Sequence, residues 1–196
     1  GMGSYSPSLI FTPELEERIR KEILDPTLKG FREDGLDFKG VLFIGLMISQ
    51  DGPKVIEFNN RFGDPETQSV LMRLDTDLFE IMESVVNNRL SSQEIKWSSQ
   101  RAVCVVLASG GYPGSYEKGK EISGLSLVDE NVMVFHAGTK FGSDGKILTD
   151  GGRVLGVTAT GETHEQARQK AFENAKKIQF EGMQYRNDIG LLNHPK

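Results

Sequence analysis

Apolar residues in the first part of the chain follow a helical spacing. A stripe with a spacing of four positions predicts a buried helix face: Leu15, Ile19 and Ile23. Thr12 followed by Pro13 predicts the start of this helix, because a hydroxyl caps free N–H groups and proline fits the first helical position. Asp25-Pro26 predicts a break or a restart, since proline removes a backbone donor.

The next hydrophobic runs predict a β-hairpin and two helices. Residues 38–48 are almost wholly apolar, too continuous for a half-exposed strand. A Gln-Asp-Gly turn at 50–52 leads to a second short run at 55–58, so we expect a hairpin in a covered sheet. Residues 65–74 and 76–86 then have helical patterns.

A polar, irregular stretch at residues 87–100 separates this region from one dominated by strands and glycine turns, and predicts domains 1–95 and 96–196. Four strand candidates follow: 102–108, 132–136, 146–148 and 153–158. Thr163 and Gln166 form a capping box for a last helix. Its apolar face consists of Ala167, Ala171, Phe172, Ala175 and Ile178. The expected class is α+β.

Composition and charge indicate which classes of binding partner are expected. The 196 residues carry a formal net charge of −5, and no run of Lys and Arg indicates nucleic acid or a membrane surface, so a small-molecule partner is favoured. The single cysteine, Cys104, lies in an apolar run without a partner for a disulfide, which indicates a reducing, cytoplasmic compartment. The sequence contains no stretch typical of a membrane span or a signal peptide. Its Gly-Met-Gly opening is either the remnant of a tag or an internal start.

Candidate chemistry gathers at residues 57–66, Glu-Phe-Asn-Asn-Arg-Phe-Gly-Asp-Pro-Glu. Side chains alternate along a strand, so Glu57, Asn59 and Arg61 are expected to project together. A carboxylate and an amide oxygen suit Mg²⁺, and Arg61 could steady a phosphate or a developing oxyanion. A polar strand end at the surface explains the same pattern equally well.

The run at residues 55–68 closely resembles a signature of the phosphoribosylamine–glycine ligase family, E-F-N-x-R-F-G-D-P-E-T-Q. Further resemblances occur in the same order as in that family, at residues 1–7, 38–47, 108–114, 135–139, 151–155 and 185–190. The resemblance covers nearly the whole chain and implies an internal start. One departure is Leu191-Leu192-Asn193-His194, where the family commonly has an aromatic residue and an arginine after Asp-Ile-Gly.

The resemblance implies the C-terminal portion of an ATP-grasp domain at 1–95, with an antiparallel sheet and helices. A small, strand-rich domain of hybrid-motif type with a final helix is implied at 96–196. Glu57 and Asn59 match the family's ligands for Mg²⁺ or Mn²⁺, and Gly45 occupies the place where many ATP-grasp enzymes add an acidic ligand. Met47 resembles the apolar floor beneath adenine, although a core methionine is the ordinary interpretation.

The substrate residues are also implied by the resemblance. Arg61 is expected to meet a phosphate or the acyl-phosphate oxygen. Asp64 is expected to receive the ammonium of glycine, or instead to cap the helix after Pro65. The segment Gly151, Gly152 and Arg153 is expected to close over substrate phosphate, or to form a tight turn between strands.

The implied reaction joins glycine to 5-phosphoribosylamine through glycyl phosphate, with ATP as co-substrate, and yields glycinamide ribonucleotide, ADP and phosphate in purine synthesis. Because the family's N-terminal domain and ATP-clamping subdomain precede this segment, we expect the fragment alone to be inactive. Two other hypotheses stay open: another ATP-grasp carboxylase or ligase, and a non-catalytic interaction module.

Overall fold

The computed structural model describes residues 1–191, and these form two compact units. We call the first the sheet unit; it comprises Gly1–Ser6, Asp64–Leu74 and the chain from Trp97 onward. The second, the hairpin unit, comprises Pro7–Gly63 and Asp75–Lys96. The departure from the family pattern at the tail begins at Leu191, and residues 192–196 lie outside the described part of the chain.

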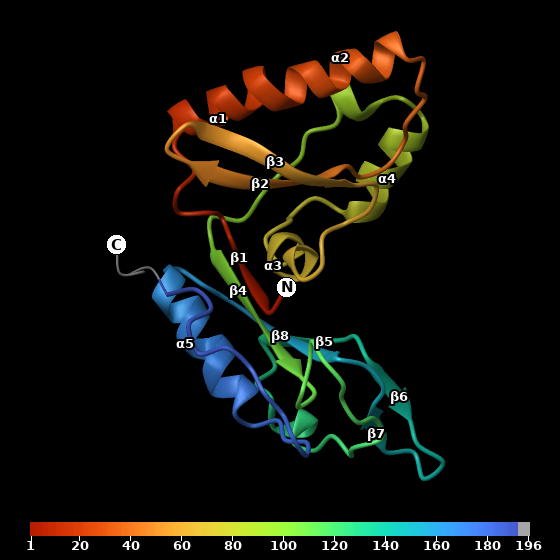
Figure 1. The fold of residues 1–196 in the computed structure, drawn as a ribbon, viewed down its shortest axis with the longest axis vertical. Helices are drawn as coiled ribbons and strands as arrows, with labels where there is room; N and C mark the ends of the chain where they lie inside the picture. Colours follow the sequence, from red (N-terminus) through yellow and green to blue (C-terminus); the bar gives the residue numbers. More distant parts are fainter. Residues whose placement is uncertain (192–196) are drawn as a thin grey trace. The chain divides into compact units, whose positions relative to one another are not determined.

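The sheet unit is built on a four-stranded antiparallel sheet with the order β1-β4-β8-β5 (Figure 1). Its strands are β1 (Gly3–Ser6), β4 (Arg101–Ala108), β5 (Val132–His136) and β8 (Arg153–Gly161). Other elements of the unit are α3 (Glu66–Leu71), a 3₁₀ turn (Leu125–Leu127), the ribbon β6 (Thr139–Phe141) with β7 (Ile147–Thr149), and α5 (His164–Ala175). The strands expected from the sequence are confirmed, and β1 and β6 are additional.

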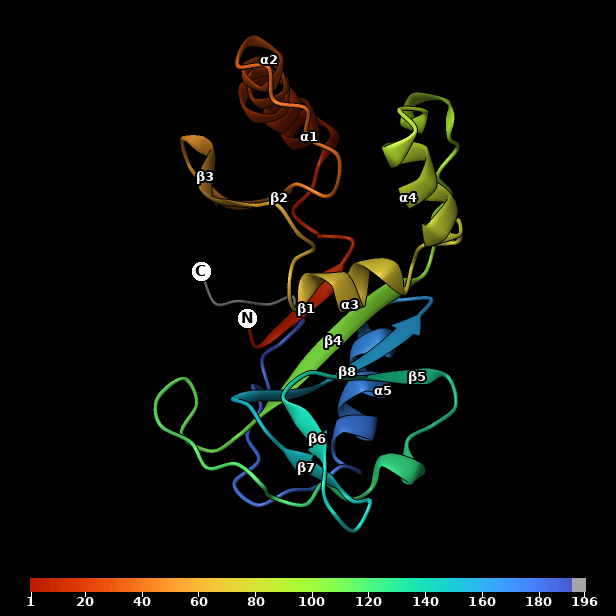
Figure 2. The same cartoon turned by 90° about the vertical axis from the view of Figure 1, so that its right-hand side faces the viewer.

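Helices cover both faces of this sheet, as Figure 2 shows for α3 and α5. On one face, Val103, Val105 and Leu107 of β4 join the apolar side of α5 in the main core. On the other face, Ser4 of β1 donates a hydrogen bond to the Pro65 carbonyl oxygen beside α3. A strand covered on both faces must be apolar throughout, which explains the continuous hydrophobic run of β4.

The last helix confirms its predicted start. The Thr163 side chain accepts a hydrogen bond from the Gln166 N–H, and the Gln166 side chain accepts one from the Thr163 N–H. The predicted apolar face is buried at all five positions, from Ala167 to Ile178.

The hairpin unit begins with a helical rod whose middle is a π-turn. Its segments are α1 (Pro13–Ile19), the π-turn (Arg20–Leu24) and α2 (Asp25–Glu33). The predicted restart at Asp25-Pro26 is confirmed: Asp25 N–H bonds to the Arg20 carbonyl oxygen, five residues back, just before the proline ring. This local widening accommodates a residue that lacks an N–H donor.

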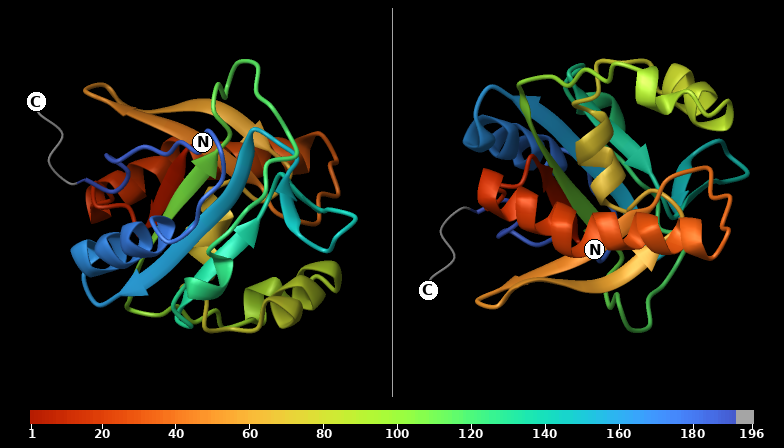
Figure 3. Two further views of the ribbon diagram at one scale, coloured as in Figure 1. Left: turned by 90° about the horizontal axis from the view of Figure 1, so that it is seen from below. Right: turned by 90° about the horizontal axis from the view of Figure 1, so that it is seen from above.

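The predicted hairpin is confirmed as β2 (Phe43–Ser49) with β3 (Gly52–Asn59) (Figure 3), and α4 (Leu78–Val86) and a 3₁₀ turn (Leu90–Ser92) complete the hairpin unit. The expectation that the sheet is covered is wrong for the described chain. Met47, Ile56 and Phe58 are 57, 61 and 51 % exposed. The reason is that, besides the two strands, the unit offers the rod that packs along β3 and the short helix α4, which is too little protein to cover both faces.

No helix within residues 1–191 has the length and apolar character needed to cross a bilayer.

Candidate functional site

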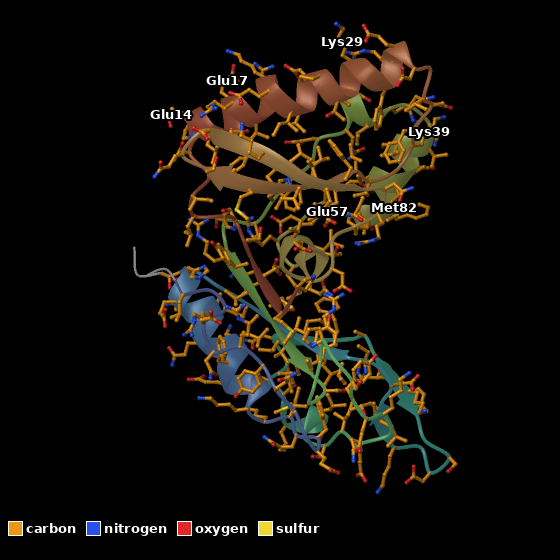
Figure 4. All side chains as sticks on the ribbon, viewed as in Figure 1. Glu14, Glu17, Lys29, Lys39, Glu57 and Met82 are labelled. Carbon is orange, nitrogen blue, oxygen red and sulfur yellow. The ribbon has the colours of Figure 1, made fainter. Side chains whose placement is uncertain are left out.

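The hairpin unit carries Glu57, which is labelled in Figure 4, and Asn59 on one face of β3. The two residues are two positions apart in a strand, so their side chains point the same way. A bulge lies just before them, opposite Gly45 and Leu46, and leaves the alternation from 57 to 59 intact. Glu57 is exposed and Asn59 is partly buried. A carboxylate and an amide oxygen therefore share one face at the end of the strand.

Arg61 lies beyond the end of β3, yet the structure brings it to Asn59. Its Nη2 donates to Asn59 Oδ1 at 3.4 Å, and its Nη1 donates to the Phe62 carbonyl oxygen at 2.8 Å. The Asn59 Nδ2 group is buried and has no hydrogen-bond partner among the described residues. A buried amide with a long bond to its oxygen and none from its nitrogen is under-satisfied, and the free N–H groups call for an acceptor oxygen and not for a cation.

The two oxygen side chains fit a hard divalent cation that keeps phosphate and water ligands, but not a closed protein cage. Within residues 1–191, no group of three or more His, Cys, Asp or Glu residues could hold a metal ion. Gly45 pairs directly with Glu57, and a Cβ at position 45 would lie 3.1 Å from Glu57 Cγ. The absence of a side chain at Gly45 therefore leaves the Glu57 carboxylate its space.

Met47 lies on the same face of the hairpin as Glu57. Gly45 and Met47 are two positions apart on β2, and Gly45 is the cross-strand partner of Glu57. The ordinary interpretation as a core methionine is wrong for the described chain, because Met47 is more than half exposed. An exposed thioether beside a carboxylate and an amide suits the flat apolar surface of a nucleotide base.

The sheet unit carries the other expected residues, and here Asp64 and Arg153 are paired. Arg153 Nη2 lies 2.9 Å from Asp64 Oδ2, and Gln68 Nε2 donates to Asp64 Oδ1 at 3.3 Å. The alternative in which Asp64 caps the following helix is wrong, because α3 begins without a side-chain cap. Asp64 instead presents its carboxylate to side chains.

Gly151 and Gly152 lie in the connection from β7 to β8 and are tightly packed. A Cβ at Gly151 would lie 2.9 Å from the Gly138 Cα, and one at Gly152 would overlap the Tyr112 ring at 2.1 Å. Ser109 donates to the carbonyl oxygens of both glycines, at 2.8 Å each. Close packing between strands therefore accounts for these glycines without a ligand.

Sequence reasoning missed the pairing of Asp64 with Arg153. The two residues are 89 positions apart, and neither motif indicates the other. The available signal was an aspartate and an arginine in two separate glycine-containing segments, and such a combination does not by itself predict that the two side chains meet.

Comparisons with known proteins define the class first. A solved structure of phosphoribosylamine–glycine ligase from Thermotoga maritima superposes with a TM-score of 0.75 at 40 % identity, over 96 % of this chain and 46 % of that chain. A biotin carboxylase domain of a thermophilic 2-oxoglutarate carboxylase gives a TM-score of 0.66 at 15 % identity, over 94 % of this chain and 41 % of that chain, which shows the fold alone. The expected mixed α+β, ATP-grasp-like fold is confirmed.

Family models and relatives then specify the family. The model described as phosphoribosylglycinamide synthetase, ATP-grasp (A) domain, matches residues 1–67, and that described as phosphoribosylglycinamide synthetase, C domain, matches residues 102–192. A phosphoribosylamine–glycine ligase from Vibrio vulnificus is 49 % identical over 97 % of this chain and 44 % of its own length. A trifunctional purine biosynthetic protein adenosine-3 from Gallus gallus is 50 % identical over 97 % of this chain and 19 % of its own length. The chain belongs to the phosphoribosylglycinamide synthetase family, and it spans less than half the length of these relatives.

Proposed function

We propose that this chain is the C-terminal part of an ATP-dependent ligase that joins glycine to 5-phosphoribosylamine in purine synthesis. The products are glycinamide ribonucleotide, ADP and phosphate, and glycyl phosphate is the intermediate. The observation that carries the proposal is the shared face of Glu57, Asn59 and Met47, in a chain that belongs to the phosphoribosylglycinamide synthetase family.

Each side chain has a defined task in this proposal. Glu57 and Asn59 hold a divalent cation, Mg²⁺ or Mn²⁺, through their oxygens, and Met47 lies beneath the adenine of ATP. When bound, the cation neutralises charge on the ATP phosphates. Arg61 releases its long bond to Asn59 and donates to a phosphate or acyl-phosphate oxygen. Asp64 receives the ammonium of glycine, so catalysis consists mainly of alignment and charge neutralisation.

The exposed apolar surface of the hairpin unit supports the idea that the chain acts within a longer protein. Only Ile19 and Ile23 are buried hydrophobic side chains among the described residues of this unit, whereas Met47, Ile56 and Phe58 of the hairpin are exposed. Several large apolar groups exposed on one hairpin are typical of a surface that a ligand or another part of a protein covers. We therefore propose that the 196-residue chain alone does not turn over, and glycine-dependent ADP release by that chain would refute this.

Three finer assignments belong to the same proposal. The domain boundary along the sequence lies between residues 95 and 96, with the ATP-grasp portion before it, and two segments of that portion, Gly1–Ser6 and Asp64–Leu74, pack with the second domain in the sheet unit. Strands β4, β8 and β5 with α5 correspond to a small domain of hybrid-motif type, and β1 of the ATP-grasp portion adds the edge strand of its sheet. The protein acts in the cytoplasm, although the relative from Arabidopsis thaliana bears the word chloroplastic in its name.

The decisive test of the reaction uses the longer protein that contains this chain. ADP release is measured with ATP, a divalent cation and phosphoribosylamine, with glycine or bicarbonate as the acid substrate. Release that depends on glycine supports the ligase, whereas release that depends on bicarbonate indicates a carboxylase.

Metal binding can be measured without turnover, on the 196-residue chain. Electron paramagnetic resonance of Mn²⁺ reports the bound fraction in wild type and in Glu57→Gln and Asn59→Ala. We expect both variants to weaken Mn²⁺ binding at least tenfold. The control is Glu80→Gln, which removes an exposed carboxylate from α4 in the same unit. Equal binding by all four proteins would show that Glu57 and Asn59 are not ligands.

A further inference from the structure

The Arg153 guanidinium already donates several hydrogen bonds to protein oxygens, which leaves it fewer donors for a ligand. Its Nη1 donates to the Asp64 carbonyl oxygen at 2.8 Å and to the Gly1 carbonyl oxygen at 3.2 Å. Its Nη2 donates to Asp64 Oδ2 at 2.9 Å. The side chain is 26 % exposed. One guanidinium thus connects β8 to two chain segments that are distant in sequence.

The surroundings of Arg153 leave little freedom to its backbone or its guanidinium. A Cβ at Gly1 would lie 2.6 Å from Arg153 Nη1, so only glycine permits this approach without a shift. A Cβ at Gly138 would lie 2.7 Å from the Arg153 carbonyl oxygen, which accepts a hydrogen bond from Gly138 N–H at 2.9 Å. The arginine is therefore fixed at both ends, and its three bonds define one direction for the guanidinium.

This arrangement also defines the direction of the Asp64 carboxylate. One oxygen accepts from Arg153 and the other accepts from Gln68 on α3. A carboxylate has about four acceptor positions, so about two remain. The Asp64 side chain is 48 % exposed, which leaves those positions open to solvent or to an ammonium group. Asp64 is therefore held in place and still able to accept.

We propose that Arg153 is a positioning residue for Asp64 and does not bind substrate phosphate. Its planar fork contacts the side chain and the main chain of Asp64 together, which the single ammonium of lysine cannot reproduce. The inference rests on the proposed function, in which Asp64 receives the ammonium of glycine. Arg153 then acts on glycine through Asp64, and this role replaces the one at the substrate phosphate that its sequence motif suggested.

The kinetic test uses the longer protein with the variants Arg153→Gln, Arg153→Lys, Asp64→Asn and the double variant Asp64→Asn/Arg153→Gln. We expect Arg153→Gln to raise the KM for glycine about tenfold, which corresponds to about 1.4 kcal/mol, and to leave the KM for ATP and for phosphoribosylamine within twofold. Arg153→Lys should recover part of the loss. The double variant should be no worse than Asp64→Asn alone, because both changes remove one interaction.

The matched control is Arg186→Gln. Arg186 forms a two-pronged pair with Asp188 in the same unit, with its side chain 60 % exposed, so it shares the chemistry but not the contacts with Asp64. We expect its KM for glycine to stay within twofold of wild type. Melting temperatures of all variants separate a positioning effect from general loss of the fold.

Four outcomes decide against the inference. A selective rise in the KM for phosphoribosylamine would assign Arg153 to the substrate phosphate. A uniform loss of all parameters together with a lower melting temperature would assign it a purely structural role. Additive effects in the double variant would show that the two residues act independently. Finally, a crystal structure of Arg153→Gln with Asp64 unmoved would show that Arg153 does not position Asp64. This structural test does not depend on enzyme activity. If the wild type shows no glycine-dependent turnover, that result overturns the proposed function and not the positioning role.

Discussion

Asn174 is a polar side chain whose hydrogen-bonding groups are all paired although it lies in an apolar core. It lies fully buried on α5. Its Nδ2 donates to Asp129 Oδ2 and to the Lys170 carbonyl oxygen, and its Oδ1 accepts from the Asp129 N–H. The side chain therefore provides hydrogen-bond partners both for the loop that precedes β5 and for its own helix.

We expect Asn174→Ala to lower the free energy of unfolding by about 2–3 kcal/mol, because the Asp129 N–H loses its acceptor and a small cavity opens. Urea unfolding of the chain measures the change. The control Asn131→Ala alters an exposed asparagine in the same loop and should change stability by less than about 0.5 kcal/mol. Equal effects of the two substitutions would show that the buried network contributes nothing specific.

Cys104 gives a pH-dependent prediction at the same scale. Burial in β4 raises the pKa of its thiol from 9.0 to about 11. Since the thiolate is the reactive form, we expect a disulfide reagent at pH 8 to leave native Cys104 unmodified and to label it fully in concentrated urea. Between pH 9 and about 11 the unfolded chain loses a proton that the native chain keeps, so stability should fall as the pH rises through this window. Rapid labelling of the native chain at pH 8 would contradict this assignment.

At the scale of elements, the sequence predicts helices and strands that depend on local patterns, but it does not predict pairings between distant segments. The apolar run of β4 and the capping box of α5 lie within a few residues, so the sequence predicts them directly. The strand β1 has the sequence Gly-Ser-Tyr-Ser, with no apolar alternation, and becomes a strand only by pairing with β4 about one hundred residues later. The contact between Asp64 and Arg153 was unpredictable for the same reason. Exposure of Met47 fits the role that the family resemblance implies, but its local pattern does not predict it, because burial depends on what covers the hairpin.

The first strand supports a prediction about its glycine. A Cβ at Gly3 would lie 2.6 Å from Ile189 Cγ2 and 2.7 Å from the Cys104 carbonyl oxygen. Because the second atom belongs to the backbone of the paired strand, Gly3→Ala must shift β1 away from β4, and we expect a loss of about 1–3 kcal/mol in urea unfolding. Gly30→Ala is the matched control: no atom lies within 4 Å of its added Cβ in α2. That change should be neutral or stabilising by up to about 1 kcal/mol. Similar losses at both sites would contradict the steric argument.

At the scale of the whole molecule, buried apolar groups are distributed unevenly between the two units. The sheet unit holds a continuous core that includes Val103, Leu107, Leu155 and Ile178. The described residues of the hairpin unit bury only Ile19 and Ile23 among their hydrophobic side chains. Since apolar burial is the main favourable contribution to folding, the two units must differ in local stability.

Hydrogen exchange can measure this difference directly. In the 196-residue chain we expect amides of β4 and β8 to exchange slowly and those of β2 and β3 to exchange at least a hundredfold faster, because a two-stranded ribbon with exposed faces opens at little cost. In the longer protein the same hairpin amides should become protected, whereas those of β4 and β8 should change little. The sheet unit thus serves as the internal control for the comparison. Strong protection of β2 and β3 in the 196-residue chain would mean that the hairpin unit is stable by itself. In that case its exposed apolar surface would no longer argue that further protein covers it.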